Sequence, residues 1–431
     1  MKTYARYKDS GISWIGNVPE HWETKRLKYV VDDFCKGNGI TKEDVFLDGN
    51  VKCVRYGEIY SKYDISFSDC YSLTKKEFIT SPQYFSYGDI LFAGTGELVE
   101  EIGKNIVYLG NEKCLAGGDI IIAKHSQNPS FLNYALESKY CRYQKSYGKA
   151  KLKVVHISAG EIGNVIILLP PLSEQKAIAE YLDKKTAQIN ELVSAKQKQI
   201  ELLKEYKQSV IADAVTGKLN KNCRMKDSGY SWIGEIPENW ESSTLRRLLK
   251  FVSDKGHPKE QLLSVTREQG VIIRNVESKE ENHNVIPEDL SDYKLVKKGQ
   301  FAINKMKSWQ GSYGVSSFTG IVSPAYYVCD LDFENKDFFS IAIRSKAYIP
   351  FFTMYSKGIR VDQWDLSPIG LKTIPFFIPP EEEQNKIVSL VKDKMEKIDS
   401  QIVSIENQIA NLNEYKQSLI SDVVTGKVKV C

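Results

Sequence analysis

Residues 8–16 read KDSGISWIG and residues 226–234 read KDSGYSWIG, so one motif occurs twice at an offset of 218 positions. At the same offset, PEHWE at residues 19–23 is followed by PENWE at residues 237–241. Such self-similarity can fix an architecture before any secondary structure is assigned. These segments predict that the chain is an internal duplication of one scaffold.

A second set of repeats lies near the end of each copy, at an offset of 209 positions. The matched segments are PPLSEQ at 170–175 with PPEEEQ at 379–384, EYKQS at 205–209 with 414–418, and VTGK at 215–218 with 424–427. The interiors between the matching frames, residues 25–169 and 243–378, show little similarity. A repeated frame around two different interiors predicts one scaffold that carries two different recognition surfaces.

Each Pro-Pro pair is followed by a long stretch without glycine or proline, which runs to Gly217 in the first copy and to Gly426 in the second. Proline before the stretch, acidic residues in its first turn and glycine after its end are helix start and stop signals. About 40 residues at 1.5 Å per residue predict two helices of roughly 60 Å.

Apolar residues recur along both helices with alternating spacings of four and three, the heptad pattern of a coiled coil. Lys196 and Lys207 interrupt the first seam, and Lys416 interrupts the second. We predict that the two helices pair with each other in an antiparallel arrangement; packing of each helix on its own domain, or a seam between two copies, are the alternatives. The predicted seam residues are Leu182, Ile189, Val193, Ile200, Leu203, Val210, Val391, Met395, Ile398, Ile402, Ile405, Ile409, Leu412 and Leu419.

The two interiors are each expected to mix helices and strands. Apolar runs bounded by glycine at 89–93, 119–123 and 299–303 predict short buried strands, and amphipathic patches at 131–141 and 336–348 predict helices. The predicted fold class is therefore α/β (mixed α+β), with two globular domains separated by two long antiparallel coiled-coil helices in a pseudo-twofold duplication. The predicted boundaries are 1–171 and 218–379 for the domains and 172–217 and 380–431 for the helices.

The duplication also extends to the chain ends. The segment that connects Gly217 to Asp227 in the middle of the chain has its counterpart in the residues after Gly426 together with those before Asp9. We therefore predict that residues 1 and 431 lie on neighbouring surfaces, and that a circularly permuted chain still folds.

Composition excludes several classes of protein. The chain has 431 residues, of which 42% are hydrophobic and 26% charged, which is typical of a globular protein. Its longest apolar run, residues 165–169, is far shorter than a membrane span. No apolar stretch follows the first basic residues, so we expect no secretory signal and a cytoplasmic protein.

The cysteines and the net charge narrow the possibilities further. Eight cysteines show neither a C-x-x-C pair nor zinc-finger spacing, so we expect reduced structural thiols. The net charge is only +4. Any surface that binds nucleic acid must therefore be local.

Basic and aromatic residues interleaved with glycine on predicted loops are the candidates for such a surface. Lysine can neutralise phosphates, glutamine can make bidentate contacts to adenine, and an aromatic ring can stack or position the loop. A solvated loop is the alternative for any one of them, and Trp309 and Trp364 could equally be core residues. The candidates are Thr95, Lys149, Lys151, Lys153, Asn304, Lys305, Lys307, Trp309, Gln310, Lys357, Arg360 and Gln363.

Catalytic motifs are missing. The sequence has no G-x-x-x-x-G-K-[ST] phosphate loop, no H-E-x-x-H and no complete G-x-G-x-x-G. Residues 128–131 (NPSF) lack the second proline and the tyrosine of the methyltransferase motif Asn-Pro-Pro-Tyr, and a turn into the following helix explains them better. We therefore expect no catalytic, cofactor or metal site in this chain.

Taken together, two copies of S-G-x-x-W-I-G-x-x-P-x-x-W, two dissimilar interiors, and two P-P-x-x-E-Q helices ending in V-T-G-K resemble the specificity subunit of type I restriction-modification enzymes. The resemblance covers essentially the whole chain. Residues 304–311 (NKMKSWQG) and 322–326 (VSPAY) are also similar to target recognition domains of that family.

The resemblance implies that each globular domain is a target recognition domain for one half of a bipartite, asymmetric site in double-stranded DNA. It implies that the helices set the spacer and dock two methyltransferase subunits, which restriction-translocase subunits then join. S-adenosylmethionine, ATP and magnesium are implied for those partners, and no cofactor is implied for this chain.

Two other classes of function remain open from the residues alone. One is a protein-interaction adaptor with two domains and a coiled-coil strut; the other is a nuclease or methyltransferase in its own right. Steep weakening of DNA binding with rising salt distinguishes a DNA-recognition protein from an adaptor, and DNA methylation by the isolated chain would indicate an enzyme.

Overall fold

The computed structural model describes residues 3–12, 15–37, 39–76, 82–150, 154–220, 223–276, 286–358 and 364–430. It consists of two compact units. Unit 1 comprises Met1–Lys196 and Glu406–Cys431, and unit 2 comprises Gln197–Ile405. These boundaries differ from the predicted ones because each long helix contributes one part of its length to each unit.

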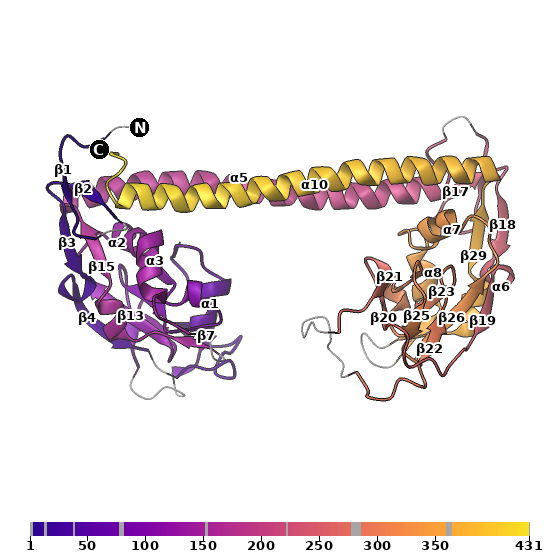
Figure 1. Ribbon diagram of the computed structural model, residues 1–431, viewed down its shortest axis with the longest axis horizontal. Coiled ribbons are helices and arrows are strands. Elements are labelled where there is room, and N and C mark those ends of the chain that lie inside the picture. Colours follow the sequence, from indigo (N-terminus) through magenta and orange to yellow (C-terminus); the bar gives the residue numbers. More distant parts are fainter. Residues whose placement is uncertain are drawn as a thin grey trace. The chain divides into compact units, whose positions relative to one another are not determined.

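The two long helices are α5 (Leu172–Val215) and α10 (Glu381–Val424), each of 44 residues (Figure 1). Both end in the same way. Gly217 and Gly426 adopt positive φ angles of 75° and 72°, and the next residue, Lys218 or Lys427, donates its backbone N–H to the carbonyl of Asp213 or Asp422. This is the glycine-based helix stop that the V-T-G-K repeats predict.

In unit 1 the first part of α5 pairs with the last part of α10. Lys196 Nζ donates to Gln408 Oε1 at 2.5 Å, and Lys416 Nζ donates to Asn190 Oδ1 at 3.0 Å. As residue numbers rise along α5, the numbers of the facing residues on α10 fall, so the two helices are antiparallel. Just beyond the contact of Lys416 with Asn190, Ile189 packs in the same hydrophobic core as Leu419.

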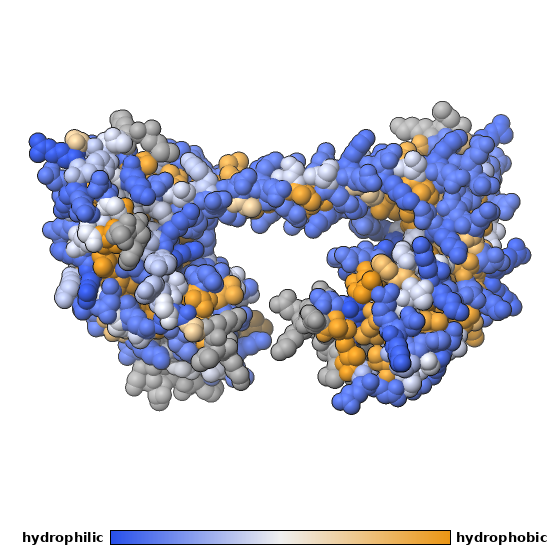
Figure 2. All heavy atoms as spheres, viewed as in Figure 1, coloured by the Kyte–Doolittle hydropathy of each residue, from blue (hydrophilic) through white to orange (hydrophobic). Residues whose placement is uncertain are grey.

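The same direction holds in unit 2. Lys207 Nζ lies 2.6 Å from Asp399 Oδ1, and Ala214 shares a core with Ile387 and Val391. The predicted antiparallel pairing of the chain with itself is confirmed within each unit. All the predicted seam residues are buried or half-buried, whereas the outward faces of both helices are mainly hydrophilic (Figure 2).

The alternative in which each helix packs on a domain is also partly correct. Ile178 and Leu182 of α5 belong to the core of the unit 1 domain, together with Trp22 and Leu168. Each helix therefore buries one stretch against a partner helix and another stretch against a globular domain. This double role explains why the compact units do not end at the helix boundaries.

The repeated frame forms the same small sheets in both units. A hairpin pairs β1 (Tyr7–Asp9) with β2 (Asn17–Pro19), and its counterpart pairs β16 (Met225–Asp227) with β17 (Glu235–Pro237). A second antiparallel pair joins β3 (Glu23–Arg26) to β15 (Ile166–Leu169), and β18 (Glu241–Thr244) to β29 (Pro375–Ile378). The internal duplication predicted from the sequence is thus confirmed in the structure.

The interior of unit 1 contains two mixed sheets. The five-stranded sheet has the order β4 (Val31–Lys36), β13 (Ile120–His125), β9 (Ile90–Ala93), β11 (Asn105–Tyr108), β6 (Ser66–Phe67). The four-stranded sheet has the order β7 (Ser72–Thr74), β5 (Val51–Val54), β12 (Cys114–Ala116), β8 (Tyr84–Phe85). The strands predicted at 89–93 and 119–123 are therefore present as β9 and β13.

The helices of unit 1 differ from the prediction in one place. The helix predicted at 131–141 is two helices, α2 (Pro129–Glu137) and α3 (Lys139–Ser146), because Ser138 adopts an extended conformation. The remaining elements of this interior are η1 (Leu27–Tyr29), α1 (Tyr56–Ser61), η3 (Val99–Glu101), α4 (Ala159–Gly163) and the short pair β10 (Thr95–Gly96) with β14 (Val155–His156).

The interior of unit 2 is built on a four-stranded antiparallel sheet. Its order is β19 (Leu249–Val252), β26 (Tyr326–Leu331), β23 (Phe301–Asn304), β24 (Tyr313–Val315). Three two-stranded pairs accompany it: β20 (Leu263–Thr266) with β21 (Gly270–Ile273), β22 (Lys294–Val296) with β25 (Gly320–Val322), and β27 (Ser356–Lys357) with β28 (Asp365–Leu366). The strand predicted at 299–303 is β23.

The helix predicted at 336–348 ends early in the structure, as α7 (Lys336–Ile343). The chain then begins α8 (Ile349–Met354), whose second residue is Pro350. The other helices of this interior are α6 (Leu245–Leu248), η4 (Ser308–Gln310) and α9 (Pro368–Thr373).

Two further predictions concern the cysteines and the absence of a membrane span. The seven cysteines in the described ranges are free thiols. Within those same ranges, the structure contains no helix that is long and apolar enough to cross a bilayer.

Candidate nucleic-acid interface

The repeated tryptophans form a matched junction in each unit. Trp22 and Trp240 are almost fully buried. Trp22 Nε1 donates to Glu174 Oε2 at 3.2 Å, and Trp240 Nε1 donates to Glu383 Oε2 at 3.1 Å. The P-x-x-W and P-P-x-x-E repeats, about 150 residues apart in the sequence, therefore meet in space.

The helix-ending glycines complete this junction. A Cβ atom on Gly426 would lie 2.3 Å from Pro19 Cδ, and a Cβ atom on Gly217 would lie 2.3 Å from Pro237 Cδ. Only glycine fits so close an approach, and only glycine adopts its positive φ without strain. The repeated frame is thus a structural device that fixes the end of one long helix against the start of the other in each unit.

The domains carry the sequence-predicted contact residues at one equivalent place. In unit 1, Ile157 N–H donates to the carbonyl of Gly94, directly before Thr95. In unit 2, Leu366 N–H donates to the carbonyl of Lys305. In unit 1 the bond joins the loop after β9 to the segment that follows residue 154. In unit 2 the bond joins the loop after β23 to the segment that follows residue 364. Among the described residues, the structure therefore brings the loop that begins at Gly94 next to Ile157 and the loop that contains Lys305 next to Leu366.

In unit 2 the candidate loop is held by buried polar groups. Asn304 is only 9% exposed, its Nδ2 donates to the Tyr326 hydroxyl at 3.0 Å, and its Oδ1 accepts from Met306 N–H. Ser308 is fully buried. Asn304 was predicted to contact nucleic acid, but its burial makes it a residue that positions the loop.

The tryptophan of this loop is anchored in a similar way. The rings of Trp309 and Trp364 lie 4.9 Å apart, and the Trp309 carbonyl accepts from Thr353 Oγ1. Trp309 is half-buried, and its Nε1 finds no hydrogen-bond partner among the described residues. The two rings therefore brace the loop, while Gln310 beside them keeps a partly exposed side chain.

Lysine side chains give the surface beside this loop of unit 2 a positive charge. Lys307 and Lys357 are exposed, and Lys305 lies 3.1 Å from the exposed carboxylate of Asp365. Burial lowers the pKa of Lys294, and the neighbouring charges of Lys255 and Lys305 lower it further. This basic group could bind phosphate. Lys294 and Lys255 were not predicted, because neither lies in the stretches of interleaved basic, aromatic and glycine residues that carry the candidates.

In unit 1 the candidates are engaged within the domain. Thr95 is 6% exposed and its hydroxyl lies 3.0 Å from His156 Nδ1. Lys149 Nζ donates to the His156 carbonyl and to Glu161 Oε1. The prediction of Thr95 as a contact residue is therefore not supported by its burial. Lys151, Lys153, Arg360 and Gln363 lie outside the described residues.

A buried charge cluster fixes the loop that carries Thr95. Lys145 is 2% exposed, and its Nζ donates to the Gly103 carbonyl at 2.7 Å and to Asn105 Oδ1 at 2.8 Å. Burial opposes the ionisation of Glu137, but Lys145 and Arg142 hold the Glu137 pKa below its usual value. Nothing in the periodicity of the sequence marks Lys145 as buried.

Within the described ranges, no group of three or more His, Cys, Asp or Glu residues is arranged to hold a metal ion. Each unit has a braced loop, and in unit 2 exposed lysines lie beside it. Such a surface can bind a polyanion and place polar side chains against base edges.

Known proteins resemble this chain over most of its length. The family model described as "Type I restriction modification DNA specificity domain" matches residues 19–202. The protein named as the MjaX type I restriction enzyme specificity subunit of Methanocaldococcus jannaschii is 26% identical, with 96% of each chain covered. The StySPI specificity subunit of Salmonella potsdam is 24% identical over 96% of this chain and 90% of its own.

A solved structure shares the fold. A chain from a study of the assembly and conformational transition of the type I R-M system matches with a TM-score of 0.65 and 12% identity. It covers 95% of this chain and 99% of that one.

Proposed function

We propose that this chain belongs to the family of type I restriction-modification specificity subunits and is the sequence-specific DNA-binding subunit of such a complex. Each unit would recognise one half of a bipartite, asymmetric site in double-stranded DNA. The observation that carries the proposal is the repeated scaffold with two different interiors, each of which presents a braced loop at the same place. The adaptor alternative is not favoured by these findings.

The two-part architecture suits this task physically. When two recognition modules act on one ligand, the second binds at an effective concentration set by their connection, so each can bind weakly while the pair is selective. The long helices α5 and α10 would set the unread gap between the half-sites and dock two methyltransferase subunits.

Catalysis would belong to the partners. We propose that methyltransferase subunits bind S-adenosylmethionine, and that restriction-translocase subunits use ATP and magnesium, in the cytoplasm where the DNA of a host cell lies. The family assignment supports a non-catalytic role for this chain.

Methylation mapping of host DNA with and without this gene tests the proposal. We expect modified sites that share two short sequences at a fixed gap and that vanish when the gene is removed. An unchanged methylation pattern, in cells that express the methyltransferase subunits, would contradict the proposal.

A second experiment tests the role of the helices. Insertion of one helical turn into both α5 and α10, at matched positions, should change the permitted gap and leave the two half-sites unchanged. Altered half-sites at an unchanged gap would rule out the helices as the ruler.

A further inference from the structure

The duplicated junction is not filled in the same way in the two units. In unit 1 the side chain of Tyr4 is only 8% exposed and belongs to the hydrophobic core. Its hydroxyl donates to Glu174 Oε1, and its ring lies 5.8 Å from the Trp22 ring in an edge-on contact. The Lys429 ammonium lies 5.7 Å from the centre of the Tyr4 ring. The tyrosine thus closes the junction of unit 1.

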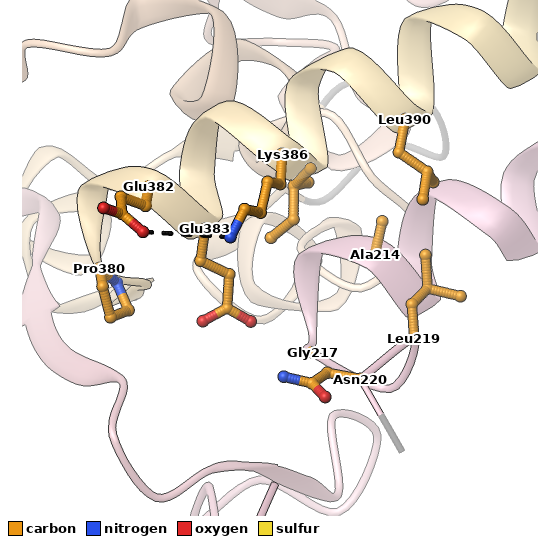
Figure 3. Close-up of a pocket in the computed structure, with 10 residues that line it drawn as sticks. Ala214, Gly217, Leu219, Asn220, Pro380, Glu382, Glu383, Lys386 and Leu390 are labelled. Atoms are coloured by element: carbon orange, nitrogen blue, oxygen red, sulfur yellow. Dashed lines mark ion pairs between the residues drawn. The ribbon is translucent and has the colours of Figure 1, made fainter. Parts of the chain in front are cut away.

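Unit 2 has a groove at the equivalent position. Its walls come from the end of α5 and the residues just after it, and from the start of α10 (Figure 3). The residues that line it are Ala214, Gly217, Leu219, Asn220, Pro380, Glu382, Glu383, Lys386, Ile387 and Leu390. At the repeat offset of 209, Glu383 is the counterpart of Glu174, and Asn220 is the counterpart of Lys429. Glu174 and Lys429 contact Tyr4 in unit 1, and their counterparts Glu383 and Asn220 line the groove in unit 2.

The groove keeps the features that hold a tyrosine. Figure 3 shows the Glu383 carboxylate pointing towards Gly217 and Asn220, across the groove from the start of α10. Its Oε2 accepts from Trp240 Nε1, as Glu174 Oε2 does from Trp22 Nε1. Leu219 and Leu390 are 39% exposed, so the walls include apolar surface that water reaches. The position equivalent to Tyr4 on the repeat offset of 218 is Asn222, which lies outside the described residues.

The charge of the groove indicates what kind of segment would enter it. The first turn of α10 carries Glu381, Glu382 and Glu383, and Glu382 is only weakly paired, 4.0 Å from Lys386 with both side chains exposed. In unit 1 the counterparts of Glu381 and Glu382 are Leu172 and Ser173. The rim in unit 2 is therefore the more acidic one, and it suits a basic ligand.

We propose that this groove of unit 2 is a docking site for a tyrosine side chain that a partner protein presents on an extended, basic segment. The tyrosine ring packs against Leu219, Ile387 and Leu390, its hydroxyl donates to Glu383, and flanking lysine or arginine residues face Glu381 and Glu382. The chain's own segment MKTYARYK, residues 1–8, has this chemistry and occupies the counterpart groove through Tyr4. A second copy of the chain is the weaker candidate, because its Tyr4 would have to leave its own unit 1.

The peptide MKTYARYK is a direct probe. A fluorescent version is titrated into the full chain beside a peptide with Tyr4→Ala, and a third peptide carries a photoreactive benzoylphenylalanine in place of the tyrosine. We expect the Tyr4→Ala peptide to bind roughly tenfold more weakly, because it loses an aromatic contact and a hydrogen bond. We expect the cross-links to fall within 214–220 and 380–390.

Matched variants of the full chain locate the site. Leu390→Glu and Leu219→Glu place a carboxylate on the apolar walls and should abolish the tyrosine-dependent part of peptide binding. Leu202→Glu, on an exposed position of α5 that does not line the groove, should leave it unchanged. Equal binding of both peptides would overturn the proposal, as would cross-links at the Tyr4 site of unit 1 or peptide-induced association of two copies. None of these readouts uses DNA, so they are independent of the proposed DNA recognition.

Discussion

Gly217 and Gly426 illustrate how single residues set the junctions. Both combine a positive φ with a proline closer than any Cβ could tolerate. Gly16 has the same φ, 72°, but nothing lies within 4 Å of the position that its Cβ would occupy. The three glycines therefore separate the cost of backbone strain from the cost of steric overlap.

Substitution of each glycine by alanine tests this separation. Gly16→Ala should lower the free energy of unfolding by about 1 kcal/mol through backbone strain alone. Gly217→Ala and Gly426→Ala should cost roughly 2–4 kcal/mol, because overpacking adds to that strain. Urea unfolding of the three variants measures the difference, and equal losses in all three would show that the proline contacts contribute nothing.

His125 gives unit 1 a pH dependence. Burial lowers the His125 pKa below its ordinary 6.5, and its Nδ1 accepts from Gln127 N–H. Below about pH 6.5 the unfolded chain binds a proton that the folded chain resists, so this contribution to stability is present at higher pH and is lost as the pH falls towards the folded-state pKa.

His125→Asn keeps an acceptor for Gln127 but cannot titrate. We expect its unfolding free energy to fall less than that of the unmodified chain between about pH 8 and about pH 5. Thermal unfolding at both pH values measures the effect. Identical pH dependence in the two proteins would assign the acid sensitivity to other groups.

At the scale of residues, the sequence predicted the frame better than the site. The repeated Trp, Pro and Gly positions could be found by self-comparison, but their contacts with Glu174 and Glu383 could not, since no local pattern encodes a partner so distant in sequence. Thr95 and Asn304 were predicted as contact residues because Thr95 lies between two glycines that allow a close approach of the backbone, and Asn304 begins a stretch of interleaved lysine, tryptophan and glycine residues. In the structure, hydrogen bonds to His156 and Tyr326 compensate the burial of these groups.

At the scale of elements, the pair of long helices also buries polar side chains that have hydrogen-bond partners. Lys207 and Lys416 are equivalent residues of α5 and α10 that interrupt the predicted seams. Lys416 is only 8% exposed and its Nζ donates to Asn190 of the partner helix and to Asp64 of the domain. The Lys207 side chain is 27% exposed and pairs with Asp399, which is 55% exposed. A lysine can therefore occupy a seam position when the facing helix offers it an acceptor.

These two lysines should differ in their contribution to stability. Lys416→Ala should cost roughly 1.5–3 kcal/mol, since it removes charge-assisted hydrogen bonds from a largely buried site, whereas Lys207→Ala should cost at most about 1 kcal/mol. A double-mutant cycle of Lys416→Ala with Asn190→Ala, followed by chemical denaturation, isolates the contact between the helices. A coupling energy near zero would mean that the seam tolerates Lys416 without using its hydrogen bond.

Helix ends and strands were predictable where strong local signals exist. The Pro-Pro pairs and the helix-ending glycines gave α5 and α10 to within a few residues, except that the predicted 380–431 includes residues after Val424 that are not helical. The break at Ser138 was not predictable, because 131–141 keeps an unbroken amphipathic pattern across it. Tertiary packing decides such breaks, and periodicity does not record them.

At the scale of the whole molecule, the duplication behaves as a closed cycle that the chain ends interrupt. In unit 2 the helix end at Gly217 leads through continuous chain to Pro237 and Trp240. In unit 1 the same junction is made by Gly426 from the end of the chain and Pro19 from its start. Tyr7 hydroxyl donates to the Gly426 carbonyl, which ties the two terminal segments together. Residues 1 and 431 themselves lie outside the described residues.

Circular permutation tests this equivalence. Residues 219–226 are enough to connect the two frame motifs in unit 2, whereas residues 428–431 and 1–8 are together available in unit 1. A direct peptide bond from Cys431 to Met1 therefore needs no linker, and new ends between Asn220 and Cys223 reproduce in unit 2 the interruption that unit 1 already has. We expect the permuted chain to fold with a Tm within about 5 °C of the original and to bind the same DNA.

The control is a permutant with new ends within α5, between Gln197 and Lys198, because this cut removes helical hydrogen bonds that no terminal segment replaces. It should lose far more stability than the first permutant. If the permutant opened between Asn220 and Cys223 were as unstable as this control, the two junctions would not be equivalent, and the end of α10 would depend on free termini in a way that the end of α5 does not. Comparable stability of that permutant and the original chain would mean that the position of the ends is incidental to the fold.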